Sequence, residues 1–342
     1  MYAFWNCTSL TSITIPYGVT VIDYSAFRGC TGLTGVTVPN SVTAMGASVF
    51  WGCTSLSSLS LPFVGANRTS AGTSAGLFGH IFGTTPNTGC TATNQYYNSS
   101  SYATYQIPNS LKTVTITDTA QIPYGAFYGC ANLTGVTLPG SLTSIGMYAF
   151  TGCAALTGIT IPALVTSLNY TFVHCPNLTT VNFAPGSQLT AIGQDAFWEC
   201  HSLTGFVIPS GVTSIGQSAF RNCVSLTSLT IPSTVSNIGY KAFDYCSNLT
   251  IYAQASSKPA GWDANWNPLN RPVVWGCSVT SGYVTSFTKS GTNPSNPGGN
   301  TVNNPQRAGY TFDGWYTNSA FTGTKYATVA AAPNGTLYAK WT

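Results

Sequence analysis

The sequence predicts a solenoid of stacked repeats with short parallel strands and short helical turns, which is an α/β architecture. Three observations predict it. Phenylalanine recurs every 22, 23 or 25 residues in two blocks of the chain. A cysteine stands three residues after each of these phenylalanines, and a leucine stands six residues after it. Each leucine is followed by alternating β-branched residues. Self-similarity at such a period indicates a repeat architecture, because one unit cannot bury its apolar face whereas stacked units can.

The spacing holds in every one of nine repeats. The phenylalanines are Phe4, Phe27, Phe50, Phe127, Phe150, Phe172, Phe197, Phe220 and Phe243. The cysteines are Cys7, Cys30, Cys53, Cys130, Cys153, Cys175, Cys200, Cys223 and Cys246. The leucines are Leu10, Leu33, Leu56, Leu133, Leu156, Leu178, Leu203, Leu226 and Leu249.

The run after each leucine predicts a half-buried strand, because it alternates with a period of two residues. In the repeat that contains Leu156, the inward residues are Ile159 and Ile161 and the outward residue is Thr160. A proline ends most of these runs, since proline has no donor for the strand ladder. The next segment, such as Ile145 to Phe150, is too short for a full helix, and one helical or 3₁₀ turn per repeat is expected.

The repeat Ile-Gly-x-x-Ala-Phe-x-x-Cys-x-x-Leu-Thr-x-Ile-x-Ile-Pro closely resembles the BspA-type leucine-rich repeats of bacterial surface proteins. The resemblance covers about residues 1–254 and implies a leucine-rich-repeat solenoid of about ten turns. Three positions depart from the motif within one repeat. Leu168 stands where glycine is usual, Thr171 replaces the alanine, and Ala184 replaces the proline. These departures concern one turn and leave the expected fold unchanged.

The array is interrupted between Phe50 and Phe127. Residues 63–107 are rich in Gly, Ser, Thr, Asn and Tyr, and they predict an excursion from the solenoid that is anchored by Phe78, Ile81 and Phe82. Long loops on rigid scaffolds either bind ligands or are partly ordered decorations, and both interpretations stay open. The chain is expected to rejoin the array at a strand near 111–116.

Three further segments follow the array. Residues 255–277 contain Trp262, Trp266 and Trp275 and predict a C-terminal cap, because the last repeat exposes an apolar face. Residues 278–304 have the composition of a linker, which predicts that the segment beyond it moves independently. Residues 305–342 contain Gly-Tyr-Thr-Phe-Asp-Gly-Trp-Tyr and Leu-Tyr-Ala-Lys-Trp, and they resemble a Listeria–Bacteroides repeat, similar to internalin B-repeats. The resemblance implies a small β-grasp-like module, here incomplete unless its first strand lies near Tyr283 to Phe287.

Composition and charge exclude several classes of function. Only 5% of the residues are charged and 44% are hydrophobic, so the chain can form a core and is not a disordered protein. The net charge of +4 comes from scattered side chains, so nucleic-acid binding, which needs a clustered basic surface, is not expected. No stretch is long and apolar enough to span a membrane. Met1 lies three residues before Phe4, which predicts an N-terminally truncated chain without its signal peptide.

The cysteine ladder predicts buried, reduced thiols. Neighbouring repeats would bring cysteines within disulfide distance, but in-register side chains point the same way, so bridging geometry is poor. Some disulfides remain an alternative. No zinc-type pairing of ligands occurs, and no metal or cofactor is expected. Cys90 and Cys277 lie outside the ladder.

No catalytic constellation is expected. Asp195 and Glu199 are the only close acidic pair, and His174 would stack beside Glu199 in repeat register. A surface pair on a solenoid turn explains them better than a glycosidase centre does, since no other catalytic motif is present. The sequence therefore predicts a protein that is not an enzyme.

The residue after each phenylalanine gives the one binding signal. Trp51, Tyr128, Trp198 and Arg221 occupy this position, and such residues are the usual anchors of protein interfaces. The alternative is intramolecular stacking, with Trp198 over Arg221 and Arg221 paired to Asp244. Outward strand residues are Thr, Ser and Gly, which predicts a weaker binding face.

Together these features predict a monomeric, secreted or cell-surface bacterial protein that recognises a host or microbial protein or glycan. Two alternatives belong to other classes. A structural spacer would hold another part away from the cell wall and would need no ligand. A binder of ice or a carbohydrate lattice would use the outward threonines, but one threonine per repeat and the expected curvature argue against it.

Overall fold

The computed structural model describes residues 2–296 and 299–342. The chain divides into two compact units. The first unit contains the chain up to Leu178 together with Phe183–Ser187, and the second contains Thr179–Asn182 together with Gln188–Thr342.

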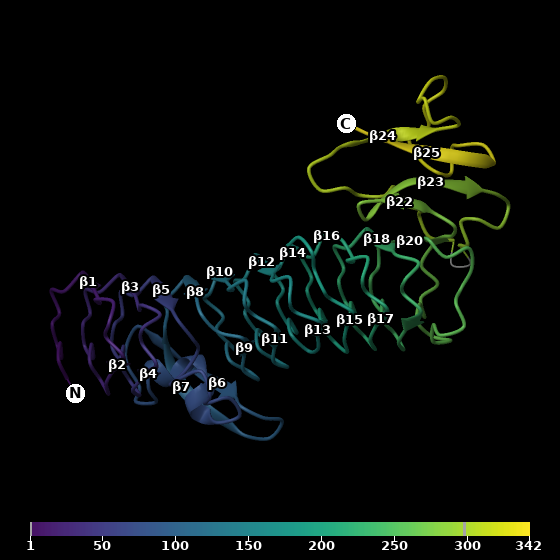
Figure 1. Cartoon of the computed structure of the whole chain (residues 1–342). Helices are drawn as coiled ribbons and strands as arrows, with labels where there is room; N and C mark the ends of the chain where they lie inside the picture. Colours follow the sequence, from purple (N-terminus) through teal and green to yellow (C-terminus); the bar gives the residue numbers. More distant parts are fainter. Residues whose placement is uncertain (1, 297–298) are drawn as a thin grey trace. The chain divides into compact units, whose positions relative to one another are not determined.

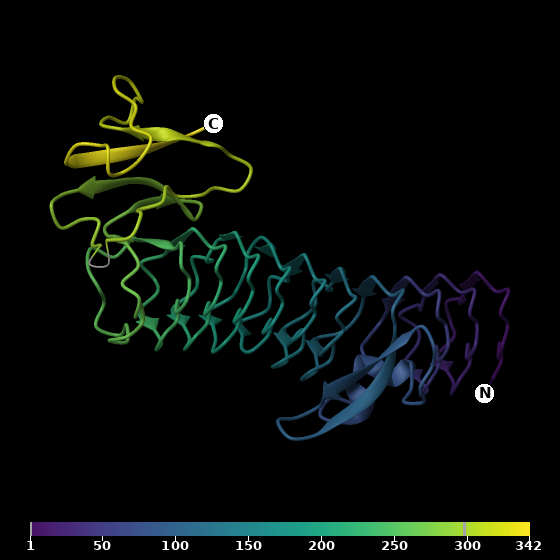
Figure 2. The same cartoon turned by 180° about the vertical axis from the view of Figure 1, so that it is seen from behind.

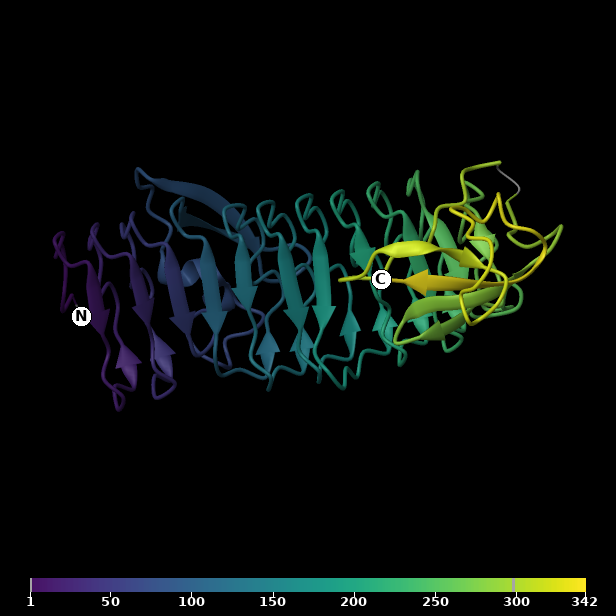
Figure 3. The same cartoon turned by 90° about the horizontal axis from the view of Figure 1, so that it is seen from above.

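The first unit is a solenoid whose front is a ladder of parallel strands, seen side by side in Figure 3. The register pairs equivalent positions of successive repeats, so that Val36 lies between Ile13 and Leu59. Alternation then turns Thr14 and Thr37 outward. The front strands are β1 (Ser12–Thr14), β3 (Gly35–Thr37), β5 (Ser58–Leu61), β8 (Thr113–Ile116), β10 (Gly135–Thr137) and β12 (Gly158–Ile161).

Five turns of this unit also carry a second strand of only two residues. These short strands are parallel too, and they bury one residue each, as in the pair Ile122 and Ile145. Between each short strand and the next front strand lies the repeated phenylalanine, called the column phenylalanine below. The short strands are β2 (Val21–Ile22), β4 (Ala44–Met45), β9 (Gln121–Ile122), β11 (Ser144–Ile145) and β13 (Ser167–Leu168).

Stacked phenylalanines form the centre of the core. The Phe27 ring lies 5.2 Å from Phe4 and 5.7 Å from Phe50, measured between ring centroids, and the rings are nearly parallel. Farther along, Phe150 lies 5.3 Å from Phe127. Constant spacing in the sequence therefore becomes a continuous aromatic column from Phe4 to Phe50 and again from Phe127 to Phe172.

The excursion completes this column instead of leaving a gap. Phe82 lies 6.4 Å from Phe50, and Phe78 lies 4.8 Å from Phe127. The main chain is bridged as well, because Phe50 N donates to Ile81 O at 2.8 Å. The anchor expected from the sequence is fully buried. Phe78 and Ile81 lie in the 3₁₀ turn η2 (Phe78–Ile81), and Phe82 follows it directly. A shorter 3₁₀ turn, η1 (Ser74–Gly76), precedes η2.

After η2 the excursion forms an antiparallel hairpin of β6 (Cys90–Tyr96) and β7 (Tyr102–Pro108). Figures 1 and 2 place the hairpin beside the turns of the first unit, away from its front strands. The front ladder itself is uninterrupted, since β5 pairs directly with β8 in register. The predicted return strand at 111–116 is thus β8.

The prediction of one helical or 3₁₀ turn in each repeat is wrong. In the described residues, the only helical segments are η1 and η2, and the column phenylalanines lie in hydrogen-bonded turns. The reason is backbone conformation. The residue two positions before the phenylalanine and the residue two positions after it both have left-handed φ. Around Phe27 these are Ser25 (φ 55°) and Gly29 (φ 76°). Single left-handed residues interrupt a right-handed helix. The alternate amides instead bond the next repeat, as Phe27 N does to Val49 O at 3.0 Å.

The motif glycine is explained by the close approach of neighbouring turns. A Cβ on Gly146 would lie 2.5 Å from Tyr124 N, so no side chain fits. The structure also corrects the alignment of the divergent repeat. Leu168 ends its short strand as Ile145 does, yet it is one residue closer to its phenylalanine. Leu168 therefore takes the isoleucine position, and the glycine itself is missing.

The second unit repeats the same plan. Its front strands pair in register, as Leu229 does with Ile251. They are β14 (Thr180–Phe183), whose last residue belongs to the first unit, β16 (Gly205–Phe206), β18 (Ser228–Ile231), β20 (Thr250–Ala253) and β21 (Val273–Val274). The short strands are β15 (Ala191–Ile192), β17 (Ser214–Ile215) and β19 (Asn237–Ile238).

Tryptophans end the aromatic column of the second unit. The Trp266 ring lies 5.9 Å from Phe243 in an edge-on arrangement and 4.6 Å from Trp262. Trp262 Nε1 donates to Val235 O at 3.1 Å, so its polar edge is satisfied inside the core. Residues 255–277 thus cover the last phenylalanine, as a cap would.

The segment expected to be a linker contains ordered strands. Within 278–304 lie β22 (Ser278–Thr280) and β23 (Tyr283–Lys289), while residues 297 and 298 lie outside the described residues. Strands β22 and β23 form an antiparallel sheet with β25 (Gly335–Trp341) and β24 (Phe312–Tyr316), in the order β22-β23-β25-β24. The strand expected near 283–287 is β23. No helix lies over this sheet in the described residues, so the β-grasp-like arrangement stays a prediction.

This sheet packs on the end of the solenoid of its own unit, which contradicts the expected independent motion. One buried cluster joins Tyr252 of β20 and Val274 of β21 to Phe287 and Trp315 of the sheet. Tyr252 Oη also donates to Asn303 O at 2.5 Å. Composition suggested a flexible tether, but the apolar faces of β23 and β25 need a partner, and the last turns supply it.

Candidate functional site

The predicted binding residues fall in two units. Trp51 and Tyr128 belong to the first unit, and Trp198 and Arg221 belong to the second. All four are partly exposed on turns that follow a column phenylalanine.

Trp51 is held on both its polar edge and its ring face. Its Nε1 donates to Thr85 O of the excursion at 2.8 Å. The Arg28 guanidinium carbon of the preceding repeat lies 4.1 Å from the centroid of the Trp51 ring, a cation–π distance. The indole is therefore fixed in position, with part of its surface still open to solvent.

Tyr128 contacts the hairpin of the excursion. Its ring lies 4.8 Å from that of Tyr96 on β6, and Tyr96 lies 5.3 Å from Tyr102 on β7. Burial and the neighbouring Tyr96 hydroxyl raise the pKa of Tyr128. The repeat pattern predicted Tyr128 but missed the two hairpin tyrosines. The signal that could have found them is the Tyr-, Ser- and Asn-rich run between 95 and 106.

In the second unit, Trp198 and Arg221 make the contacts of the intramolecular alternative. The Arg221 guanidinium carbon lies 5.7 Å from the Trp198 ring and 5.4 Å from the Tyr245 ring. Its Nε lies 3.7 Å from Asp244 Oδ2, a buried carboxylate that Lys241 also approaches at 3.9 Å. Much of the binding capacity of Arg221 is therefore used within the fold.

A shallow groove lies over the front strands of the first unit. Its volume is about 420 Å³, and its lining includes Thr14, Gly35, Thr37, Ser58 and Ser60. No charged side chain lines it. The groove provides hydroxyl groups and small apolar surfaces, so it is a second, more polar candidate for ligand contact.

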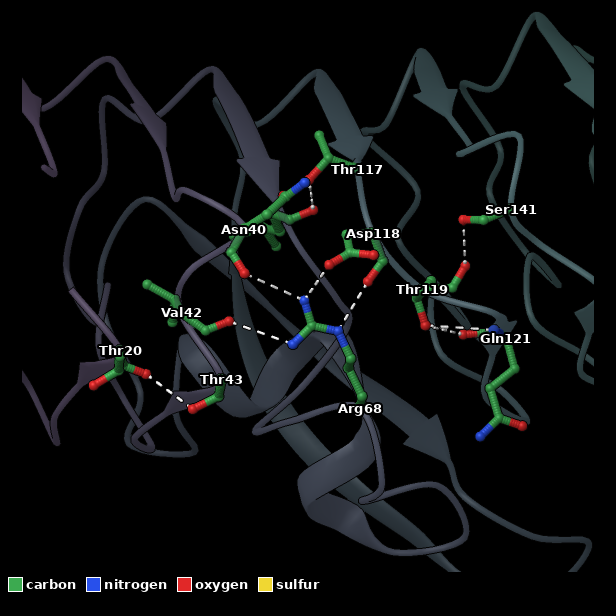
Figure 4. Close-up of polar contacts among 11 residues, drawn as sticks. Thr20, Asn40, Val42, Thr43, Arg68, Thr117, Asp118, Thr119, Gln121 and Ser141 are labelled. Carbon is green, nitrogen blue, oxygen red and sulfur yellow. Dashed lines mark hydrogen bonds and ion pairs between the residues drawn. The ribbon is translucent and has the colours of Figure 1, made fainter. Parts of the chain in front are cut away.

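Arg68 fastens the excursion to the solenoid (Figure 4). Its NH2 group lies 2.5 Å from Asp118 Oδ2, and its Nε donates to Asp118 O at 3.1 Å. On the other side, its guanidinium donates to Asn40 O and Val42 O, both at 3.5 Å. No pattern in the sequence singles out Arg68. Since it ties the excursion to turns before and after it, its role is structural.

The ladder thiols are hydrogen-bond donors within the core. All eleven cysteines are free. Cys153 Sγ donates to Phe127 O at 3.3 Å, and the same contact recurs in other repeats. Burial raises the pKa of Cys175 to about 12. One expectation needs correction, because the ladder residue Cys7 is exposed, with no described turn stacked in front of it. Cys277, which lies outside the ladder, is buried under the C-terminal sheet.

The close acidic pair of the sequence, Asp195 and Glu199, lies on a solenoid turn. In the part of the chain that the structure describes, no three His, Cys, Asp or Glu side chains lie close enough to share a metal ion. Burial raises the pKa of Asp195, and Gln194 Nε2 donates to its carboxylate at 3.4 Å. Asp195 and Glu199 both have left-handed φ, 48° and 61°, which fits residues that shape a turn.

Comparison with known proteins supports this description. The sequence profile of the BspA type leucine rich repeat region matches residues 1–75 and 120–250, in six copies. The profile of the Listeria-Bacteroides repeat domain matches residues 280–340, so this domain begins within the segment expected to be a linker. No curated protein matches the chain. No helix of the described residues has the length and apolarity needed to cross a membrane.

Several solved structures are similar. A leucine-rich repeat protein from Bacteroides ovatus is 20% identical, with 78% of this chain and 66% of that chain covered and a TM-score of 0.37. A leucine rich cell surface protein from Faecalibacterium prausnitzii is 23% identical, with coverages of 71% and 62% and a TM-score of 0.34. This chain thus spans slightly less than two thirds of the length of either protein. Because the repeat profile covers more than half of the 342 residues, the chain belongs to the BspA-type leucine-rich-repeat family.

Proposed function

We propose that the chain is a non-catalytic recognition or adhesion protein of a bacterial surface or of the extracellular space. Its ligand is a protein or glycan of a host or of a neighbouring microbe, and it acts as a monomer. The match to the BspA-type repeat family supports this assignment.

The observation that carries the proposal is the set of aromatic side chains on the turn edge. Trp51 and Tyr128 are each fixed by a neighbour and still partly exposed. Rigid, half-exposed aromatic residues lose little conformational entropy on binding and dominate interface energies. Trp198 and Arg221 are the equivalent contacts of the second unit in this proposal.

The organisation that goes with this proposal assigns binding to the array. Residues 1–254 present the ligand-binding edges, with 63–107 as an inserted part of that surface. Residues 255–277 close the apolar end of the array, and the sheet of 278–342 covers that end further. In this proposal residues 278–342 are a single segment, in place of the linker 278–304 and the module 305–342 that the sequence predicted.

Binding arrays test the proposal. The intact chain is applied to one array of purified serum and extracellular-matrix proteins and to one array of glycans. Replacing Trp51→Ala together with Tyr128→Ala should weaken any binding by at least about tenfold, as loss of interface anchors does. The matched control is Thr14→Ala with Thr37→Ala in the groove of the front strands. Loss of binding in the control pair alone would place the site in that groove.

A second candidate is a structural spacer without a ligand. The pairing of Arg28 with Trp51, and of Arg221 with Trp198 and Asp244, favours it, because these side chains already satisfy one another. The folded chain would then bind nothing on either array.

A further inference from the structure

The hairpin of the excursion has an unusual composition for a decoration on a solenoid. Between 95 and 106 it carries four tyrosines, three serines and one asparagine. Its tip is ordered by Asn98, whose Oδ1 accepts from Ser100 N at 2.9 Å and from Ser101 N at 2.8 Å. Tyrosine, serine and asparagine are the residues that antibody loops use, because tyrosine offers rigid contact area and the small polar residues adapt their hydrogen bonds.

The hairpin tyrosines join tyrosines of the solenoid turns in one surface. Tyr102, Tyr96 and Tyr128 follow one another at 5.3 and 4.8 Å between ring centroids. In the neighbouring turns, Tyr148 lies 5.4 Å from Tyr124 and 4.8 Å from Tyr170. Tyr124 directly precedes Gly125, whose Cα lies so close to Tyr96 O that no Cβ would fit, so the two groups of tyrosines lie next to each other. These six residues, called the tyrosine surface below, are Tyr96, Tyr102, Tyr124, Tyr128, Tyr148 and Tyr170.

The hairpin is locked against the turn that carries Tyr128. Gln95 is fully buried, where its Oε1 accepts from Gly79 N at 2.7 Å and its Nε2 donates to Tyr128 O at 3.4 Å. Gly125, in the turn that carries Tyr128, shows how closely the hairpin approaches this turn. A Cβ there would lie 1.9 Å from Tyr96 O, whereas the equivalent positions of other repeats hold larger residues at similar φ, such as Tyr148. Glycine at 125 therefore serves the approach of the hairpin and not the turn conformation.

The two stretches of chain that supply the tyrosine surface are uncharged. The sequence has no Asp, Glu, Lys or Arg between residues 69 and 111, and none between 119 and 194. A highly charged partner, such as nucleic acid or an acidic polysaccharide, would gain no electrostatic attraction here. The lack of charged residues in these stretches thus favours a partner whose contact surface is also uncharged.

We propose that the tyrosine surface binds an uncharged patch on a folded protein, which rests on the recognition function proposed above. Sugars stack on open ring faces, but here the rings cover one another. Tyr148 and Tyr170 are stacked at 28°, and the other rings are tilted against neighbours. Tyr102 is the most open of the six at 52% exposure. Tyrosine combines an apolar ring with a hydroxyl group, and both suit the side chains and backbone amides of a protein.

The test uses the full chain on the same two arrays, with Tyr96→Ser plus Tyr102→Ser as the variant. The control is Tyr17→Ser plus Tyr240→Ser, which removes two exposed tyrosines elsewhere. We expect binding to a purified protein, at least about tenfold weaker in the hairpin variant and unchanged in the control. The dissociation constant should change less than about twofold between about 50 and about 500 mM salt, since no charge pair is involved.

The outcomes separate the two proposals. Binding to glycans alone overturns the protein partner while the recognition function stands. Protein binding that survives in the hairpin variant, or that falls steeply with salt, overturns the tyrosine surface as the site. Absence of binding on both arrays overturns both proposals and favours the spacer. Buried Cys130, beside Gln95, reports whether the hairpin variant is still docked, because its thiol should stay protected from labelling.

Discussion

Replacing Leu156 by alanine should destabilise the first unit strongly. Leu156 is fully buried, and its amide donates to Cys153 O at 3.1 Å within the same turn. The substitution removes three carbon groups from the core, or about 2.4 kcal/mol at about 0.8 kcal/mol for each. Incomplete collapse of the cavity raises the expected loss to about 2–5 kcal/mol.

The assay is thiol labelling of the native protein, read by mass spectrometry at each cysteine. Cys153 is fully buried, so its labelling reports the opening of its turn. A loss of about 2.4 kcal/mol should speed labelling of Cys153 about 50-fold when opening is in rapid equilibrium. Cys130 and Cys175 in the adjacent turns should follow, because neighbouring repeats stabilise each other.

The control is Thr160→Ala in the front strand of the same repeat. Thr160 is exposed, so this change should cost less than about 0.5 kcal/mol and speed labelling about twofold at most. Equal acceleration by the two substitutions would show that the inward and outward faces of the strand are assigned wrongly.

Three other outcomes follow from the packing. Gly216→Ala should cost about 1–3 kcal/mol in urea unfolding, because its Cβ would lie 2.5 Å from the backbone, whereas Gly205→Ala meets nothing within 4 Å and should be tolerated. The free energy of unfolding should fall as the pH rises from 9.0 towards about 12, because Cys53 stays protonated in the folded state and ionises in the unfolded state; Cys53→Ala should make this fall less steep without abolishing it, since other buried thiols such as Cys175 contribute in the same way. Deleting 278–342 should uncover Tyr252 and make Cys277 rapidly reactive, and continued protection of Cys277 would contradict docking of the sheet.

The candidate site was only partly predictable. Trp51 and Tyr128 stand at a constant offset from a repeated phenylalanine, so stacking of the repeats fixed their edge in advance. Tyr96 and Tyr102 lie in a segment without periodicity. Whether they would face Tyr128 depended on how the hairpin docks, which rests on contacts such as that of Gln95 with Gly79. No local pattern encodes such a contact.

The sequence by itself determined the repeat, its register and its core. A constant spacing forces equivalent residues to stack, so Val36 had to lie beside Ile13 and Phe27 beside Phe4. Only the tertiary structure decided the form of the turns, because left-handed residues such as Ser25 exclude a helix. The type of the side chain at Ser25 does not predict a left-handed φ. The docking of the C-terminal sheet was likewise decided in three dimensions. It depends on burial of Tyr252 against residues that are far away in the chain, and composition carries no record of such a contact.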